Sequence, residues 1–271
     1  MSRNYPKISI IMPSYNQGQF IEESIQSVIN QNYPNLEFII IDGDSNDNTV
    51  EIIKKYQNDI TFWVSEKDNG QTHAINKGFK IATGDIITWL CSDDTYLSET
   101  LLTVGKHFRK NNSADFVYGN ARAVNINGET IKEIRCLKFN ILSFLARVNT
   151  IPQPASFYRK KILDTVGYLD ESLYLGMDYD FFAKISLHGF KIQFLNKTLA
   201  TYRYHANSKT VLGLDATNEH NETMNALRKK YIRLYNVSFT QLFFAKKYFF
   251  LLKKFKNIKQ YWIFRKSYAK K

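Results

Sequence analysis

Three groups of polar residues stand where short apolar segments of the chain end. They are Pro13-Ser14-Tyr15-Asn16, Asp42-Gly43-Asp44-Ser45 and Ser92-Asp93-Asp94. Carboxylates gathered at one place repel a phosphate group unless a divalent cation stands between them, and Mg²⁺ and Mn²⁺ prefer oxygen ligands of this kind. Neither G-x-G-x-x-G nor G-x-x-x-x-G-K-[ST] occurs, which excludes the usual dinucleotide and P-loop sites. We therefore predict a metal–diphosphate site that takes a nucleotide substrate.

Alternating strands and helices in the first half of the chain would position these groups. Apolar runs predict strands at 7–12, 36–41, 61–65 and 85–90, and helical spacing predicts helices at 20–29, 49–56 and 71–82. This alternation is typical of a parallel sheet with helices on both faces. Ligands bind at the carboxyl ends of the strands of such sheets, where the polar groups fall.

The second half is less regular. Asn127-Gly128 predicts a hairpin because both residues tolerate positive φ. Strands are expected at 156–158, 191–194 and 199–202, and helices at 160–166 and 178–187, the last of them ended by Gly189. The predicted fold class is α/β, with a mixed, mostly parallel sheet flanked by helices and a helical, basic C-terminal extension.

The formal net charge of +12 belongs to the end of the chain. Residues 228–271 hold fourteen Lys or Arg and no acid, and without them 23 basic residues face 25 acidic ones, a net charge of −2 for residues 1–227. A nearly neutral main body argues against a nucleic-acid groove on the core fold. We expect no nucleic-acid partner.

The segment 239–271 interleaves ten Lys or Arg with eleven aromatic residues. This pattern favours one or two helices in the plane of an anionic membrane surface. The alternative is that the aromatic residues pack on the main domain or on a partner subunit.

Cellular location follows from three further features. The two cysteines, Cys91 and Cys136, cannot form a disulfide framework, which favours a reducing compartment. We recognise no signal peptide and no stretch of about 18 apolar residues that could span a membrane. We expect a cytoplasmic protein or one bound peripherally to the inner face of the cell membrane.

The motifs resemble those of family 2 glycosyltransferases. The resemblance rests on ISIIMPSYNQGQFIEESIQSVINQ, EFIIIDGDSNDNT, NGQTHAINKGFKIATGDIITWLCSDD, GYLDESLYLGMDYDFF and YRYHANSKT, in that order, over about residues 6–210. It implies a Rossmann-like GT-A fold and a nucleotide-sugar donor, and most enzymes of the family invert the anomeric centre. The implied glycosyltransferase domain is 1–214, with a nucleotide-binding half at about 1–95 and an acceptor half at about 96–214, followed by an extension at 215–271.

The resemblance also implies roles for single residues in the donor site. Asp42 would accept from the uracil or equivalent base beside the backbone of Pro13–Tyr15, with Asp44 facing the nucleoside. Asp93 and Asp94 would hold Mn²⁺ or Mg²⁺ and the ribose, and His205 would approach from the other side. The remaining residues of the implied donor site are Asn16, Asn76 and Ser92. Cys91 stands where the family often has an acid, and we expect it to be a buried spacer.

The acceptor-side segment contains two candidates for the catalytic base, Asp178 and Asp180. They lie two residues apart on a predicted helix, roughly 200° around its axis, so only one is expected to face the site. The family pattern favours Asp178.

We expect transfer of a sugar from a UDP-sugar to a saccharide or lipid-linked acceptor in surface-polysaccharide synthesis. The alternatives are a catalytically weakened sugar-nucleotide-binding paralogue, because of Cys91, and a sugar nucleotidyltransferase. A purely structural interpretation also exists, in which turns and helix ends account for the acids. These residues are Asp42, Asp44, Asp47, Ser92-Asp93-Asp94, Asp178 and Asp180.

Overall fold

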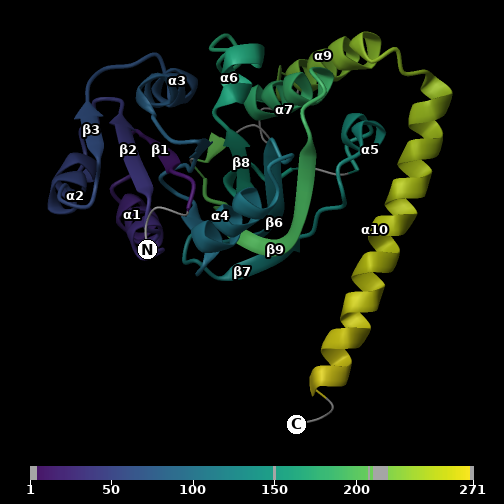
Figure 1. Cartoon of the computed structure of the whole chain (residues 1–271), viewed down its shortest axis with the longest axis horizontal. Helices are drawn as coiled ribbons and strands as arrows, with labels where there is room; N and C mark the ends of the chain where they lie inside the picture. Colours follow the sequence, from purple (N-terminus) through teal and green to yellow (C-terminus); the bar gives the residue numbers. More distant parts are fainter. Residues whose placement is uncertain (1–4, 149–150, 207, 210–218, 269–271) are drawn as a thin grey trace.

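A single nine-stranded sheet organises the protein. The computed structural model describes residues 5–148, 151–206, 208–209 and 219–268, with side chains described up to residue 254. Within this part of the chain the strands follow the order β3-β2-β1-β4-β8-β6-β9-β5, and β7 pairs with β6 outside that path (Figure 1).

Each strand and helix predicted for the first half is confirmed. Strands β3, β2, β1 and β4 are parallel neighbours, as the alternation predicts. The elements are β1 (Ile8–Ser14), α1 (Ile21–Ile29), β2 (Leu36–Asp42), α2 (Thr49–Lys55), β3 (Phe62–Ser65), α3 (Gln71–Ile81) and β4 (Ile86–Trp89).

The second half adds both antiparallel and parallel pairs, so the sheet is mixed. Strand β8 runs antiparallel to β4 and β6, whereas β9 runs parallel to β6. The predicted hairpin is confirmed between β6 and β7, with Gly128 at a φ of 81°. The elements are β5 (Thr95–Tyr96), α4 (Thr100–Lys110), β6 (Phe116–Val124), β7 (Thr130–Ile134), α5 (Ile141–Leu145), β8 (Ser156–Arg159), α6 (Lys161–Val166), α7 (Met177–Leu187) and β9 (Ile192–Arg203).

The prediction of two separate strands at 191–194 and 199–202 is wrong, because both belong to β9. The polar residues between them resemble a turn in sequence. In the structure the chain stays extended there, and the pairing register with β6 shifts on both sides of Asn120. The polar residues that suggested a break between two strands therefore lie at an irregularity, or bulge, within one continuous strand.

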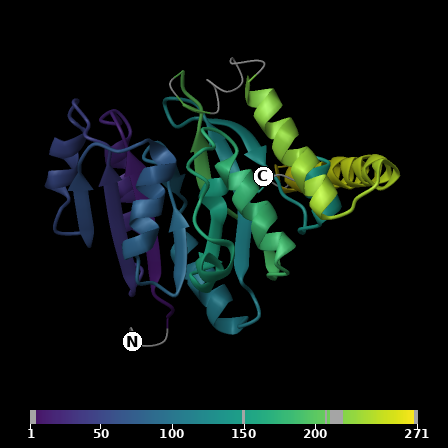
Figure 2. The ribbon, with the colours of Figure 1, turned by 90° about the horizontal axis from the view of Figure 1, so that it is seen from above.

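The core has two layers, one on each face of the sheet (Figure 2). Successive residues of β1 point to opposite faces, so that Ile10 and Met12 pack with α1, α2 and α4, whereas Ile11 packs with α3 and α7. A Cβ atom on Gly78 of α3 would lie 2.4 Å from the side chain of Ile11. Glycine thus lets α3 lie close against β1.

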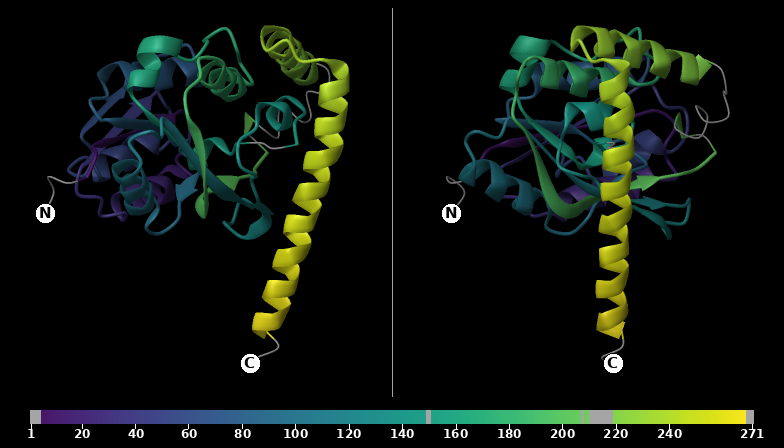
Figure 3. Two further views of the ribbon diagram at one scale, coloured as in Figure 1. Left: turned by 45° about the vertical axis from the view of Figure 1, so that its right-hand side comes forward. Right: turned by 90° about the vertical axis from the view of Figure 1, so that its right-hand side faces the viewer.

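Two helices complete the described chain, α9 (Glu219–Leu234) and α10 (Phe239–Tyr268). Leu227 and Tyr231 of α9 belong to the same buried cluster as α7. Helix α10 contacts α5, and its C-terminal part extends beyond the rest of the protein (Figures 1 and 3). No helix in the described residues combines the length and the apolar character needed to cross a bilayer.

Glu37 is a buried carboxylate at the amino end of the sheet, opposite the predicted site. Its side chain is 6% exposed. It accepts hydrogen bonds from Lys7 Nζ and from the N–H of Thr83, both at 2.7 Å, and from the hydroxyl of Ser9. Burial raises the pKa of Glu37, but these hydrogen bonds outweigh it and lower the pKa from 4.5 to about 2.

We predict that Glu37 makes the fold sensitive to acid. Above pH 4.5 the carboxylate is ionised in the folded and the unfolded chain, and its contribution is complete. As the pH falls towards about 2 the unfolded chain binds the proton first, so on the order of 3 kcal/mol of unfolding free energy is lost.

Urea unfolding at about pH 5.5 and about pH 3 measures this loss. The variant Glu37→Gln should be less stable at the higher pH and should lose less stability on acidification than the wild type. Glu51→Gln, on the exposed side of α2, is the control and should behave as the wild type. An equal acid loss in Glu37→Gln and the wild type would contradict the prediction.

Candidate active site

The carboxyl ends of β1, β2 and β3 lie side by side. Ser14 is paired with Asp42, and Asp42 with Ser65. The N–H of Gly43 continues this pairing by donating to the carbonyl of Ser14 at 2.9 Å. The first two polar groups predicted from the sequence are therefore neighbours at one edge of the sheet.

Asp42 is fully buried and shapes the loop that follows β2. Its Oδ2 accepts from the N–H of Ser45 at 2.9 Å and from the hydroxyl of Ser65 at 2.7 Å, and its Oδ1 accepts from the hydroxyl of Ser45 at 2.6 Å. The loop turns so that Asp44 is exposed with a φ of 67°. Asp42 holds the loop, and Asp44 is the carboxylate on its surface.

The loop after β1 is locked to the loop after β2. The N–H of Asn16 donates to Ser45 Oγ at 2.8 Å, and Asn16 Oδ1 accepts from the N–H of Asn46 at 3.0 Å. Tyr15 is exposed beside them, whereas Pro13 and Ser14 are buried below. The two loops therefore form one continuous wall at the strand ends.

Asp68 is a further carboxylate at this edge that no sequence pattern had singled out. A Cβ atom on Gly43 would lie 3.0 Å from Asp68 Oδ2, so the loops after β2 and β3 meet closely where glycine stands. Its only sequence signal is a turn, since Asp68 begins an Asp-Asn-Gly segment and its Oδ1 accepts from the N–H of Gly70 at 2.7 Å.

The third polar group forms an acidic cluster, which we define as Cys91, Asp93 and Asp94. The Sγ atom of the thiol and one oxygen of each carboxylate lie within 4.8 Å of one another. Asp94 is 3% exposed, and its Oδ1 accepts from the N–H of Arg203 at 2.9 Å. Burial raises the pKa of Asp94 well above its usual range, and the charge of Asp93 raises it further.

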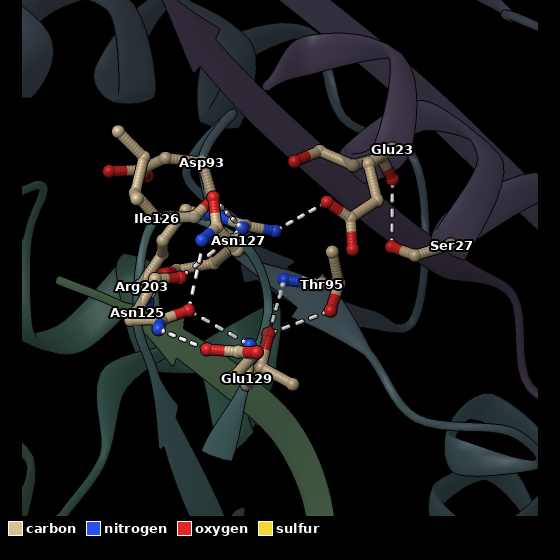
Figure 4. Close-up of polar contacts among 12 residues, drawn as sticks. Glu23, Ser27, Asp93, Thr95, Asn125, Ile126, Asn127, Glu129 and Arg203 are labelled. Carbon is tan, nitrogen blue, oxygen red and sulfur yellow. Dashed lines mark hydrogen bonds and ion pairs between the residues drawn. The ribbon is translucent and has the colours of Figure 1, made fainter. Parts of the chain in front are cut away.

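Arg203 connects the acidic cluster to the surrounding elements. Its buried guanidinium donates from Nε to the carbonyl of Asp93 and from Nη1 to the carbonyl of Ile126, each at 2.9 Å. Nη2 forms an ion pair with Glu23 of α1 (Figure 4). The loop after β4, the β6–β7 hairpin and α1 thus meet at one side chain. In the sequence, only its place two residues before His205 marks it.

His205 joins the acidic cluster through Asp93. Its Nε2 lies 3.0 Å from Asp93 Oδ2, and its ring packs on Phe20 with the ring centroids 4.6 Å apart. The predicted approach of His205 to the acids from a distant segment therefore has a geometric basis, whereas a metal-ligating role stays a prediction.

Cys91 differs from the expected buried spacer, because it is half-buried and its Sγ lies among polar groups. The amide Nε2 of Gln71, in the first turn of α3, lies 3.1 Å from Sγ. Burial raises the pKa of this thiol well above its usual range, and the charges of Asp94 and Asp93 raise it further. A protonated thiol is a poor ligand for Mg²⁺ or Mn²⁺.

The acceptor-side helix lies within electrostatic reach of Cys91. The charge of Asp178 raises the pKa of the Cys91 thiol, whereas the charge of Lys209 lowers it. Asp178 is half-buried in the first turn of α7. Lys209 lies with its Nζ 4.3 Å from the ring centroid of Tyr174 and 3.3 Å from the carbonyl oxygen of that residue. Lys209 is a second charged residue that the residue-level prediction missed, although it lies in the YRYHANSKT segment.

Asp180 lies in a different environment from Asp178. It is 1% exposed and contacts Lys184 Nζ at 2.6 Å, Lys230 Nζ at 3.0 Å and the hydroxyl of Tyr231 at 2.7 Å. Burial raises its pKa, but the hydrogen bonds from Lys184, Tyr231 and Lys230 outweigh it and hold the pKa below its usual range. Asp180 thus fastens α7 to α9.

Two other predicted site residues are also buried. Asn76 joins α3 to the segment before α7, donating to the carbonyl of Leu169 at 2.9 Å and to Glu171 Oε1 at 2.8 Å. Ser92 is buried between Cys91 and Asp93. In this structure both support the walls of the site.

Comparison with known proteins agrees with this geometry. A family model described as glycosyl transferase family 2 matches residues 9–167, more than half of the chain. The chain belongs to this glycosyltransferase family. It is 30% identical over 206 residues to an uncharacterized glycosyltransferase of Methanocaldococcus jannaschii, covering 73% of this chain and 71% of that one.

Further similarities concern a polysaccharide synthase and a solved structure. The glycosyltransferase is 30% identical over 176 residues to the poly-beta-1,6-N-acetyl-D-glucosamine synthase of Staphylococcus epidermidis, which is 61% of this chain and only 42% of that enzyme. The crystal structure of S. aureus TarS 1-349 in complex with UDP-GlcNAc has a TM-score of 0.64 and 20% sequence identity, covering 90% of this chain and 80% of that one. This likeness confirms the predicted GT-A fold.

The donor set of the glycosyltransferase fits a divalent cation. Asp93 and Asp94 offer hard oxygen ligands within 4.8 Å of each other. The raised pKa of Asp94 arises from burial beside a second carboxylate, and a cation between the two would relieve that repulsion. The acids therefore suit Mg²⁺ or Mn²⁺, while the Cys91 thiol does not.

We predict that Mn²⁺ stabilises the protein through Asp94. At Mn²⁺ about a hundredfold above its dissociation constant, the folded state should gain about 3 kcal/mol, measured as a rise in melting temperature with UDP present. Asp94→Asn should abolish most of the rise, because the amide is a weaker ligand and carries no charge. Asp164→Asn, an exposed acid on α6, is the matched control. An undiminished Mn²⁺ effect in Asp94→Asn would exclude this carboxylate as a ligand.

Proposed function

We propose that this enzyme transfers a sugar from a UDP-sugar to a hydroxyl group of a saccharide or lipid-linked acceptor in surface-polysaccharide synthesis, with inversion at the anomeric carbon. The observation that carries the proposal is the acidic cluster at the strand ends, with Asp178 of α7 within electrostatic reach of it. A cation site and a separate carboxylate base are the two requirements of a direct displacement from a diphosphate.

The donor nucleoside would lie on the wall formed by the loops after β1 and β2. Tyr15, Asn16 and Asp44 are exposed on this wall and can contact a base and a ribose. Asp42 and Ser14 lie beneath this wall and hold its shape. Asp42 would contact the base edge after the loop that follows β2 opens. Asn76 and Ser92 would act through the walls that they support. The UDP-GlcNAc bound to TarS supports the choice of a UDP-sugar.

The diphosphate would lie over the acidic cluster. Asp94 and Asp93 would hold the divalent cation, with His205 orienting Asp93 through the 3.0 Å contact. When bound, the cation would stabilise the negative charge that develops on the departing nucleoside diphosphate. Lys209 supplies a positive charge within electrostatic reach of Cys91, where it can contact the same leaving group.

Asp178 would act as the general base. The acceptor hydroxyl attacks the anomeric carbon as the bond to the diphosphate breaks, and Asp178 accepts the hydroxyl proton in the same step. One displacement inverts the anomeric centre. Asp180 cannot take this role in the same conformation, because its oxygens are occupied by Lys184, Lys230 and Tyr231.

The domain boundaries and the location of the enzyme are part of the proposal. We assign the catalytic domain to 1–214 and the extension to 215–271, although α9 of the extension packs into the domain core through Leu227 and Tyr231. A lipid-linked acceptor would place the enzyme at the inner face of the cell membrane. A weakened sugar-nucleotide-binding paralogue is the second candidate, favoured by Cys91 at the cluster.

Release of UDP from a panel of UDP-sugars, with Mn²⁺ or with EDTA, tests the reaction class. We expect slow UDP release with one of the sugars, dependent on the cation, because water can replace the acceptor at low rates. Binding of a UDP-sugar by calorimetry with no release under any condition would favour the weakened paralogue. Pyrophosphate formation from a nucleoside triphosphate and a sugar phosphate would identify a nucleotidyltransferase instead.

The variants Asp178→Asn and Asp180→Asn test which of the two acids is the general base and which one stabilises the fold. Loss of a general base lowers turnover by about 10²–10⁴-fold, and Asp178→Asn should show this loss with the donor affinity nearly unchanged. Asp180→Asn should instead lower the unfolding free energy by about 1.5–3 kcal/mol, because the charge-assisted hydrogen bonds from Lys184, Lys230 and Tyr231 are weakened. A folded, inactive Asp180→Asn beside an active Asp178→Asn would reverse the assignment.

A further inference from the structure

Helix α10 has one face that contacts the rest of the protein. Leu242 and Ala245 are buried, Phe249 is half-buried, and Leu242 and Phe249 pack in the cluster that includes Leu145 and Val148. One turn further, Lys253 Nζ donates to the carbonyl of Val148 at 3.0 Å. These contacts repeat every three to four residues, so they form one seam that fixes α10 beside α5.

The opposite side of α10 is an exposed apolar stripe, which we define as Phe244, Tyr248 and Leu251. Their side chains are 64%, 59% and 52% exposed. Phe244 lies two residues from Leu242, and Leu251 two residues from Phe249, which places the stripe about 200° around the axis from the seam. In the sequence, apolar residues recur with the same spacing of three and four at 255, 258 and 262.

Lysines flank the stripe without any acid to balance them. Lys247 precedes Tyr248 and Lys254 follows Leu251 by one turn, and both are exposed. From 239 to 268 the sequence contains eight Lys or Arg and neither Asp nor Glu. The stripe is therefore an apolar surface bordered on one side by positive charge, on a helix whose C-terminal part extends beyond the domain (Figures 1 and 3).

This charge pattern favours one of two partners for the apolar face, which are a second copy of the chain and an anionic bilayer. In a helix pair formed by two copies of the chain, the lysines of one α10 would meet no acid on the other, and the uncompensated like charges would oppose pairing. An anionic bilayer provides the opposite charge together with an apolar interior. Lysines beside the stripe can extend their charged ends to the headgroups while their stems stay near apolar side chains.

We propose that the stripe of α10 is a membrane-contacting surface, with the helix lying in the plane of a bilayer that contains anionic lipid. Phe244, Tyr248 and Leu251 enter the interface between headgroups and acyl chains, and Lys247 and Lys254 contact lipid phosphates. The seam holds α10 against α5 at the same time, so the catalytic domain is oriented relative to the bilayer by a rigid contact. This contact does not depend on the sugar that the enzyme transfers.

Flotation of the full-length protein with lipid vesicles tests the proposal. Vesicles of phosphatidylcholine with about a third phosphatidylglycerol should bind the protein, and vesicles of phosphatidylcholine alone should bind it far less. The triple variant Phe244→Gln, Tyr248→Gln and Leu251→Gln should lose at least about tenfold in vesicle affinity, because the apolar surface is removed. The double variant Lys247→Gln and Lys254→Gln should lose about fivefold per lysine, for anionic vesicles only.

Matched controls test whether the loss of any exposed lysine or any exposed apolar side chain would weaken vesicle binding in the same way. Lys106→Gln with Lys110→Gln removes two exposed lysines from α4, and Ile131→Gln removes an exposed apolar side chain from β7. Both should bind anionic vesicles as the wild type does. Thermal melting should show that every variant is folded, since all the changed side chains are exposed.

Two results would overturn the proposal. The first is a triple variant that floats with anionic vesicles as well as the wild type. The second is a wild-type dimer in solution, seen by light scattering, that the triple variant converts to a monomer, because the stripe would then bind a second copy of the chain.

Discussion

The buried guanidinium of Arg203 is the interaction on which the proposed site depends. It satisfies carbonyl groups of two separate loops, those of Asp93 and Ile126, and it pairs with Glu23 of α1. The backbone N–H of the same residue donates to Asp94. One residue at the end of β9 thus determines how the loop after β4 faces the rest of the enzyme. Without it, the loop that carries the two carboxylates would lose its connection to the β6–β7 hairpin and to α1.

The buried acids at the two ends of the sheet have pKa values that are shifted in opposite directions. At the amino end, Glu37 is matched with a lysine and hydroxyl groups, so its pKa falls and the ionised form contributes to stability. At the carboxyl end, Asp94 is buried beside another acid, and its pKa rises. Buried acids with a raised pKa are typical of sites where a ligand supplies compensating positive charge. On helix α7, Asp180 is likewise matched by cations, and the charge of Asp178 reaches Cys91 of the cluster.

The sequence predicts the donor half well because its strands are buried on both faces. An apolar run such as 38–41, rich in Ile, favours a strand in the interior of a parallel sheet. The acceptor half is harder, because its features depend on partners distant in the chain. The continuity of β9 follows from its pairing with β6, and the burial of Asp180 from Tyr231, fifty-one residues away. The YRYHANSKT segment contains Arg203 and Lys209, but their roles depend on distant partners, because an arginine or lysine has the same local sequence signal whether it is solvated or buried.

The clamp between α9 and Asp180 has a consequence for biosynthesis. Domains generally fold as units as they emerge from the ribosome, beginning at the N-terminus. Here α7 carries a buried carboxylate whose partners Lys230 and Tyr231 are translated much later than the sheet strands around it. The catalytic core can reach its final packing only after α9 has left the ribosome. Because Leu242 and Phe249 of α10 pack in the same cluster as Tyr231, this packing is completed only when the first part of α10 has also emerged.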